Sequence, residues 1–331
     1  MTAAIAVDLG KTGCRAVVRA DGAVPARTVH EVPGAPGLAA ENGVATARAA
    51  VRAAVQPLLE REPSLRPATV CVGAAGAAAA PEAARALAVR LLEDLPVPEV
   101  AVTSDAVTAH AGALGGRVGV VLAIGTGSVA VGIGDDGSYA RVDGWGPWLG
   151  DEGGGAWLGA AGLRAALRAH DGRGPATALL AAAVERFGAP DRLPSAVSRD
   201  GNQARTIASF APDVARAAAE GDATASAIVR DAAGALSEAV LAAARRIGGD
   251  AHVVTVTGGL TGLGEPLLGP LRSALTGSPQ SLEWRSPLGD PLDGAGLLAL
   301  DASAPHESHV TRVRRAAPNV PTPPLTSSAA V

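Results

Sequence analysis

Two segments of this sequence follow one plan at a constant offset of 115 residues, and this repeat restricts the fold more than any other feature. Each segment, 3–22 and 118–137, has an apolar run, a turn rich in glycine and hydroxyl side chains, a second apolar run and an Asp-Gly pair. Apolar runs joined by glycine-rich turns predict β-hairpins. Two hairpins in the same register indicate an internal duplication, so we expect two related halves.

Strands and helices alternate through the rest of the chain. Apolar patterns predict strands at 68–73, 99–103 and 251–257, and helices at 44–61, 81–94, 105–114, 156–170, 176–187, 202–220, 222–247, 265–276 and 291–300. Strands that alternate with helices form a largely parallel sheet covered by helices. The sequence therefore predicts an α/β fold.

The length of 331 residues exceeds what one hydrophobic core usually serves, so we expect two domains. The first is placed at residues 1–115 plus 288–302, and the second at 116–287. The final segment, 303–331, is rich in Pro, Ser and Ala and has no apolar periodicity. It is predicted to be a disordered tail.

Charge and hydropathy limit the partners that this chain can have. A formal net charge of -4 gives no reason to expect nucleic acid or an anionic membrane, which attract a clustered positive field. No basic leader precedes a long apolar stretch, and no run of about 18 apolar residues occurs, so a cytoplasmic protein is expected. Cys14 and Cys71 lie in strand-like runs and are expected to be buried thiols. The sequence leaves the oligomeric state open, a homodimer included.

The turn of the first hairpin contains Lys11, the only lysine in the chain. A P-loop would need a glycine six residues earlier, where this chain has Ile5, and a helix afterwards, where a strand is expected. The surviving interpretation is a turn whose backbone amides and Thr12 hydroxyl bind a phosphate, with Gly10 permitting close approach. An ordinary hairpin turn is the alternative.

The turn of the second hairpin offers Thr126, Gly127 and Ser128, which could hold the same ligand from the opposite side. Asp8 stands at the carboxyl end of the first strand, where the side chains of α/β proteins meet their ligands. We expect it to position magnesium, directly or through water.

Three of the four tryptophans fall in GWGPWLGDEGGGAW, residues 144–157, beside two carboxylates and six glycines. Planar side chains pack against the C–H faces of sugars, and carboxylates accept hydrogen bonds from sugar hydroxyls. This concentration indicates a sugar site in which Asp151 is a ligand. Trp157, at helical spacing, is expected to pack in the core instead.

Asp105 follows the predicted strand 99–103 and begins a helix. An aspartate in the first helical turn is common for structural reasons. A carboxylate at the end of a strand can also accept the proton of a sugar hydroxyl, as a general base does. Both interpretations remain open on the residues alone.

The two turns, in VDLGKTGCRAVV and AIGTGSVAVGI, together with VTVTGGLTGLG, resemble the phosphate-1, phosphate-2 and adenosine motifs of the actin/hexokinase/sugar-kinase superfamily. The tryptophan block resembles the signature of N-acetylglucosamine kinases in the family shared with benzoyl-CoA-reductase-type ATPases. The resemblance covers about residues 3–301. It implies a two-domain actin-like ATPase fold, related to ribonuclease H, with a cleft between the domains.

The resemblance also implies a reaction, in which ATP with Mg2+ phosphorylates the 6-hydroxyl of N-acetylglucosamine. It makes Asp105 the general base, and it makes Gly258 and Gly259 the contacts of adenosine. It assigns Gly144, Trp145, Gly146 and Asp151 to the amino sugar, with Ser128 and Glu152 as further contacts.

Departures from the family pattern keep alternatives open. Lys11 occupies a usual glycine position, and its ammonium either supplements magnesium at the phosphates or points to solvent. Val129 stands where some members have asparagine, so glucosamine or N-acetylmuramate could replace N-acetylglucosamine as substrate. An ATPase activator that holds an iron–sulfur cluster and a sugar-sensing protein are the alternatives from other classes.

Overall fold

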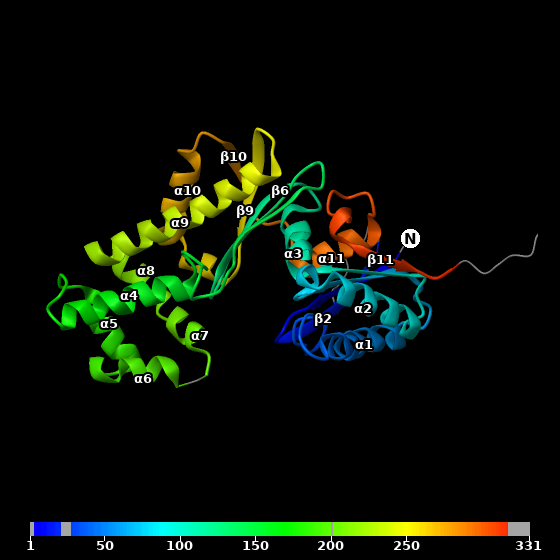
Figure 1. The fold of residues 1–331 in the computed structure, drawn as a ribbon, viewed down its shortest axis with the longest axis horizontal. Helices are drawn as coiled ribbons and strands as arrows, with labels where there is room; N and C mark the ends of the chain where they lie inside the picture. The colour runs from blue at the N-terminus through cyan, green and yellow to red at the C-terminus, as the bar shows by residue number, and fades with distance from the viewer. Residues whose placement is uncertain (1–2, 21–27, 200, 317–331) are drawn as a thin grey trace, which may run out of the picture.

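The computed structural model describes residues 3–20, 28–199 and 201–316, which form two halves, each built on a mixed β-sheet (Figure 1). The first sheet has the order β11-β5-β4-β1-β2-β3 and the second the order β10-β9-β6-β7-β8. The chain crosses from one half to the other between α3 and β6 and again between β10 and α11. In Figure 1 the second half, with most of the helices, lies on the left.

The first sheet carries helices on both faces. Its elements are β1 (Ala3–Leu9), β2 (Gly13–Ala20), β3 (His30–Pro33), β4 (Pro67–Ala74), β5 (Glu99–Ser104) and β11 (Thr311–Arg314), with α1 (Gly43–Arg61), the 3-10 turn η1 (Ala77–Ala79), α2 (Pro81–Asp94), α3 (Asp105–Leu114) and α11 (Pro291–Leu300). Side chains alternate along β1, so Ile5 and Val7 pack with α1 and α2, whereas Ala4 and Ala6 pack with α3 and α11. The small alanines let the second pair of helices approach the sheet closely.

The second sheet is covered mainly by helices on one face. Its elements are β6 (Gly119–Ile124), β7 (Ser128–Ile133), β8 (Tyr139–Asp143), β9 (Ala251–Thr257) and β10 (Ser281–Trp284), with α4 (Gly155–His170), α5 (Ala178–Phe187), η2 (Pro190–Arg192), α6 (Leu193–Ser198), α7 (Gln203–Ala208), α8 (Ala211–Ala219), α9 (Ala223–Ile247), η3 (Gly259–Leu263) and α10 (Glu265–Thr276). Trp157 packs against this core, as its helical spacing predicts. Leu114 of α3 contacts the other face of the sheet in a small cluster with Val121, so α3 touches both sheets.

Both predicted hairpins are present, and each continues into a third antiparallel strand, β3 or β8, which the apolar pattern did not indicate. The predicted helix 202–220 is wrong as one element, because it breaks at Phe210 into α7 and α8. Pro212 follows in the first turn of α8 and has no N–H to continue the earlier helix. The Asp21-Gly22 turn lies outside the described residues.

The predicted disordered tail is wrong for residues 303–316. Strand β11 pairs antiparallel with β5, and η4 (Glu307–His309) precedes it. Within this segment Arg312 forms ion pairs with Glu99 at 2.8 Å and Glu307 at 2.6 Å. A four-residue strand has no periodicity to recognise, and its hydrogen bonds come from a sheet edge that the rest of the chain supplies. Residues 317–331 of the tail lie outside the described part of the chain.

None of the described helices is long and apolar enough to cross a lipid bilayer.

Candidate active site

The two halves enclose a cavity of about 1080 Å³, which the turns of both hairpins reach. Eight of the predicted site residues line it: Asp8, Lys11, Asp105, Gly127, Ser128, Gly144, Asp151 and Gly258. Seven others lie next to this lining without forming part of it: Gly10, Thr12, Thr126, Trp145, Gly146, Glu152 and Gly259. The structure thus brings the three sequence motifs to one cavity.

The two turns present their backbone in the same way. In the first, the carbonyl oxygens of Gly10 and Thr12 accept hydrogen bonds from Ala35 and Gly34, each at 3.2 Å. Within the described residues, the amide N–H groups of Lys11 and Thr12 have no acceptor. Free amides at a tight turn form a concavity that suits an anion.

The second turn repeats this arrangement with different supports. The carbonyl oxygens of Gly125 and Thr126 accept hydrogen bonds from Gly155 and Ala156, each at 2.8 Å, at the start of α4. The amides of Thr126 and Gly127 have no acceptor among the described residues. The hydroxyl of Ser128 donates to the carbonyl oxygen of Glu152 at 2.7 Å, so it also fixes the turn against the next loop.

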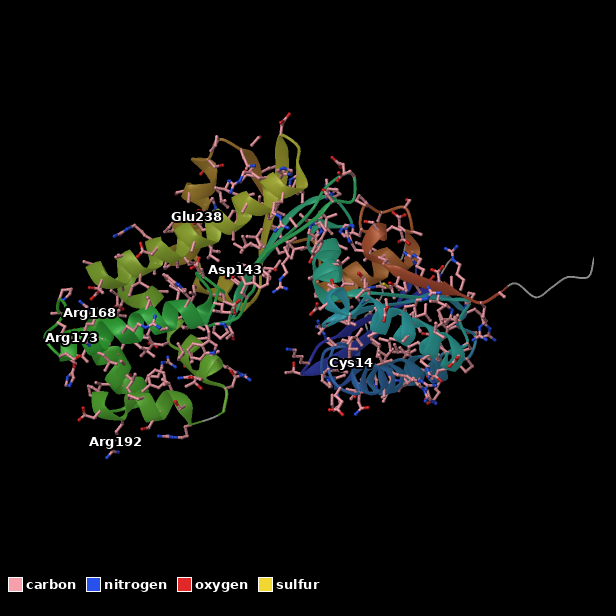
Figure 2. All side chains as sticks on the ribbon, in the orientation of Figure 1. Cys14, Asp143, Arg168, Arg173, Arg192 and Glu238 are labelled. Atoms are coloured by element: carbon pink, nitrogen blue, oxygen red, sulfur yellow. The ribbon has the colours of Figure 1, made fainter. Side chains whose placement is uncertain are left out.

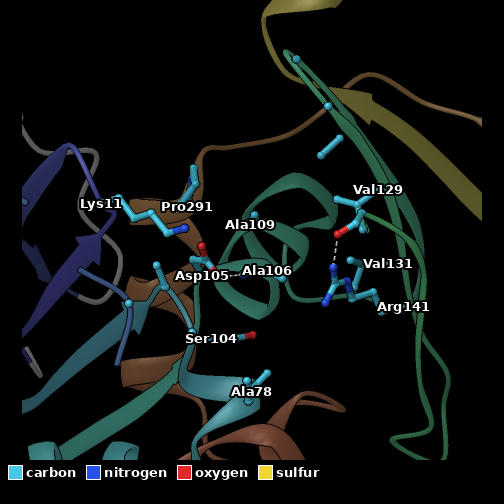
Figure 3. A pocket seen from close by; sticks show the side chains of 18 of the residues that line it. Lys11, Ala78, Ser104, Asp105, Ala106, Ala109, Val129, Val131, Arg141 and Pro291 are labelled. Carbon is cyan, nitrogen blue, oxygen red and sulfur yellow. Dashed lines mark hydrogen bonds between the residues drawn. The ribbon is translucent and has the colours of Figure 1, made fainter. Parts of the chain in front are cut away.

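Asp8 and Lys11 bring the charges of the first turn into the cavity. Oδ2 of Asp8 accepts a hydrogen bond from Nη2 of Arg15 at 2.6 Å, which leaves Oδ1 without a partner in the described chain. The side chain of Lys11 extends into the cavity toward Asp105 (Figure 3). A single ammonium thus faces the space between the two turns.

Asp105 is the first residue of α3, whose N-cap is Ser104. The hydroxyl of Ser104 accepts a hydrogen bond from the amide of Val107 at 3.2 Å and so fixes the start of the helix. The Asp105 carboxylate is open to the cavity, but protein surrounds it on its other sides, and this burial raises its pKa. The negative charge of Asp8 raises that pKa further, while the amide of Ala106 and the charge of Lys11 lower it. A carboxylate with a raised pKa is the stronger base.

The loop between β8 and α4 is organised by Asp143, a residue to which the sequence assigned no role (Figure 2). Asp143 has a positive φ of 62° and accepts hydrogen bonds from the amides of Asp151 and Glu152, both at 2.8 Å. A Cβ on Gly150 would lie 2.2 Å from Oδ1 of Asp143, so glycine is needed there. No periodic pattern marks such a residue, because its partners are backbone amides.

Asp151 lies against the second turn. Its Oδ1 accepts a hydrogen bond from the amide of Gly146 at 3.2 Å, and a Cβ on Gly127 would lie 2.1 Å from its Oδ2. Trp145 is 68% exposed and Glu152 turns to the surface, so neither packs into the cavity wall in this conformation. Asp151 is therefore the carboxylate of the tryptophan block that faces the cavity.

Gly258 directly follows β9, has a φ of 98° and packs on the carbonyl oxygen of Ile124, where a Cβ would approach to 2.2 Å. Only glycine fits this position. No side chain therefore projects from this position, which lines the cavity.

Tyr139 and Arg141 also line the cavity, although the sequence analysis assigned them no role. Both are in β8, two residues apart, and a strand places such residues on one face. The signal was present in the alternation of this strand, but the strand itself was not predicted.

Cys14 and Cys71 are free and buried, as predicted, and burial raises the pKa of each thiol to about 12 (Figure 2). No group of three or more His, Cys, Asp or Glu side chains in the described part of the chain could hold a metal ion. Cys14 and Cys71 pack in different hydrophobic clusters, so these two thiols do not share one site. A magnesium ion needs less protein, because one carboxylate, water and phosphate oxygens suffice, and the free Oδ1 of Asp8 fits that role.

Two related sheets that direct a pair of glycine-rich turns into one cleft define a two-domain actin-like ATPase, which confirms the predicted fold. Residues 5–283 match the profile of the BadF/BadG/BcrA/BcrD ATPase family, and the chain belongs to this family.

Similar proteins are named as sugar kinases. An N-acetylmuramic acid/N-acetylglucosamine kinase of Clostridium acetobutylicum is 29% identical over 171 residues, which cover 50% of this chain and 54% of that protein. An N-acetyl-D-glucosamine kinase of Dictyostelium discoideum is 29% identical over 206 residues, which cover 60% of this chain and 65% of that protein. The matched segments thus span less than two thirds of either relative.

Among solved structures, a candidate N-acetylglucosamine kinase of Chromobacterium violaceum has a TM-score of 0.65 and 28% identity, covering 91% of this chain and 99% of that one. A glucokinase of Streptomyces griseus, solved with glucose and AMPPNP, has a TM-score of 0.51 and 19% identity and supports the fold alone. It covers 90% of this chain and 99% of that one.

Proposed function

We propose that this protein transfers the γ-phosphate of ATP to the 6-hydroxyl of an amino sugar of the N-acetylglucosamine type. The observation that carries the proposal is that two turns with free amides and the carboxylate of Asp105 line one cavity. The names of the relatives support the substrate class, with N-acetylmuramate and glucosamine as alternatives to N-acetylglucosamine.

The residues of the cavity divide the work of such a transfer. The amides of both turns and the ammonium of Lys11 bind the phosphate oxygens, and Asp151 accepts a hydrogen bond from a sugar hydroxyl. Asp105 takes the proton of the 6-hydroxyl as its oxygen bonds to the γ-phosphorus. The bond between that phosphorus and the bridging oxygen then breaks, and ADP leaves. General-base assistance contributes about 10²–10⁴-fold to a rate.

Mg2+ bound by Asp8 would neutralise charge on the phosphates, which is the main requirement of phosphoryl transfer. The protein contributes to this step by orienting the carboxylate of Asp8. Arg15 holds Oδ2 of Asp8 and thereby directs Oδ1 toward the cavity. Closure of the two halves over the substrates would exclude water, which otherwise competes as the acceptor.

Coupled ADP release tests the proposal across a panel of N-acetylglucosamine, glucosamine, N-acetylmuramate, glucose and mannose. We expect release that depends on an amino sugar and that Asp105→Asn abolishes almost completely. Release that is equal with and without any sugar would instead favour a simple ATPase. Sugar binding by calorimetry without ADP release would favour a sensor.

A further inference from the structure

One wall of the cavity combines apolar side chains with a single positive charge. Register pairs Val131 of β7 with Arg141 of β8. Val129, Val131, Tyr139 and Arg141 all line the cavity, and Figure 3 shows the two valines and Arg141 on the wall across from Asp105. This wall offers alkyl and aromatic surface and one guanidinium, with few groups that could accept hydrogen bonds from sugar hydroxyls.

The guanidinium of Arg141 is fixed in place. Its Nη2 donates to the carbonyl oxygen of Gly144, and its central carbon lies 5.2 Å from the centroid of the Trp145 ring. No carboxylate in the described residues forms an ion pair with Arg141. Arg15, in contrast, forms an ion pair with Asp8 at 2.6 Å. Nε and Nη1 of Arg141 therefore remain available to a ligand, in a plane that the protein has already set.

The guanidinium of Arg141 lies beside the loop that is predicted to bind the sugar. Val131, its partner in the register, is three residues past Ser128 along β7, and a strand rises about 3.3 Å per residue. The backbone of Arg141 is therefore displaced by about 10 Å along the strands from the second turn. Its guanidinium, however, reaches back to Gly144, where a Cβ would lie 3.0 Å from Nη2 of Arg141 and 3.0 Å from the Val129 side chain. Gly144 is one of the predicted sugar contacts, so the guanidinium lies beside the position expected for the acceptor.

We propose that the acceptor is an amino sugar that carries a carboxylate on a short alkyl substituent, and that Arg141 binds this carboxylate. The inference rests on the proposed function and specifies its substrate class. Val129, Val131 and Tyr139 contact the alkyl part, and two N–H groups of the guanidinium donate to the two carboxylate oxygens. Such planar, charge-assisted pairs are the strong ones. A neutral hexose leaves the guanidinium without a counter-charge.

The test compares N-acetylmuramate with its methyl amide, which keeps the rest of the molecule but carries no charge, in the ADP-release assay. In the unmodified protein we expect kcat/KM to be on the order of 10- to 100-fold higher for the carboxylate, as for a hydrogen-bonded charge pair. Arg141→Gln should reduce this ratio to about 1, and Arg141→Lys should keep part of it. Arg246→Gln is the matched control. Arg246 lies on α9 outside the cavity lining, and its guanidinium donates to the backbone oxygen of Arg141 at 2.9 Å.

Two results would overturn the inference: equal kcat/KM for the acid and the amide in the unmodified protein, or an Arg141→Gln variant that loses activity equally on both. The second result would mean that Arg141 acts through the Gly144 loop. Failure of the proposed function can be distinguished from failure of this inference, because no amino sugar would then stimulate ADP release. In that case calorimetry of N-acetylmuramate and its methyl amide, with and without Arg141→Gln, still decides whether Arg141 binds the carboxylate.

Discussion

The first and second hairpins occupy equivalent places in the two halves but do different work. The first brings the charges of Asp8 and Lys11 to the cavity and lies close to Asp105. The second carries no charge in its turn and is held from behind by the backbone of α4 and the carboxylate of Asp151. Both halves thus keep free amides in their turns, while the charged side chains lie in the first half and the turn with the additional supports lies in the second.

The largest effect on activity is expected from a substitution near the first hairpin, where the charged side chains lie. Asp105→Asn removes the proposed general base and leaves the N-cap of α3 intact, so kcat should fall about 10²–10⁴-fold with little change in the KM of either substrate. Steady-state ADP release measures both constants. Asp135→Asn, an exposed position in the second half, is the matched control. A loss of kcat below about 10-fold in Asp105→Asn would contradict the proposal that the catalytic base lies beside the first hairpin.

The contact that joins the halves predicts a pH effect on stability. His110 of α3 and His306 of the C-terminal segment are fully buried, with Nδ1 of His110 2.9 Å from Nε2 of His306 and Nε2 of His110 3.0 Å from the carbonyl oxygen of Gly119 at the start of β6. The second bond requires N–H at Nε2 of His110, so its Nδ1 accepts from His306 when both rings are neutral. Burial lowers the pKa of His110 to about 3 and that of His306 to about 4.

Because the folded protein keeps both rings neutral, the unfolded chain binds more protons once the pH falls below its histidine pKa of about 6.5. Stability should therefore be unaffected at pH 7 and fall as the pH drops from about 6.5 to about 4 for His306 and to about 3 for His110, by at most about 1.4 kcal/mol per pH unit for each ring. Urea unfolding at several pH values measures the slope. His306→Asn should lower the slope, and His170→Asn, on the surface, changes it little. Equal slopes in all three proteins would contradict the neutral pair.

Much of this architecture could be predicted from the sequence, because periodic apolar patterns and glycine turns repeat. The short strands β3, β8, β10 and β11 were missed, since each is stabilised by a sheet edge that distant residues supply. The same limit applies to the site. Asp105, Asp8 and Asp151 stand at recognisable points of strands or glycine-rich segments. Asp143 acts only on backbone amides. Arg141 lies on a five-residue strand that was not predicted, so the alternation that places it on the cavity face could not be used.

A substitution in the turn of the second hairpin is expected to have a moderate effect on activity. In Gly127→Ala the new Cβ would lie 2.1 Å from Oδ2 of Asp151, so this carboxylate must move. We expect kcat/KM for the sugar to fall by about 10- to 100-fold, as a misplaced binding group does, with a stability loss of about 1–3 kcal/mol. A Cβ on Gly125 meets no described atom within 4 Å, so Gly125→Ala is the matched control for stability and for the sugar KM. Similar constants in both variants would mean that Asp151 does not bind the sugar.

The smallest expected effect tests the charge that distinguishes the two turns. Lys11 has no counterpart in the second turn, where the corresponding residue is Thr126. Its side chain is exposed in the open cavity, so water weakens its attraction to phosphate, and we expect Lys11→Ala to raise the KM for ATP by about 10-fold. Lys11→Arg keeps the charge and should recover most of that loss. If the charge is what matters, the defect of Lys11→Ala should grow as salt is lowered and shrink as salt is raised, because salt screens the attraction. An unchanged KM and kcat in Lys11→Ala would show that the amides of the two turns hold the phosphates without it, and the hairpins would then differ in Asp8 alone.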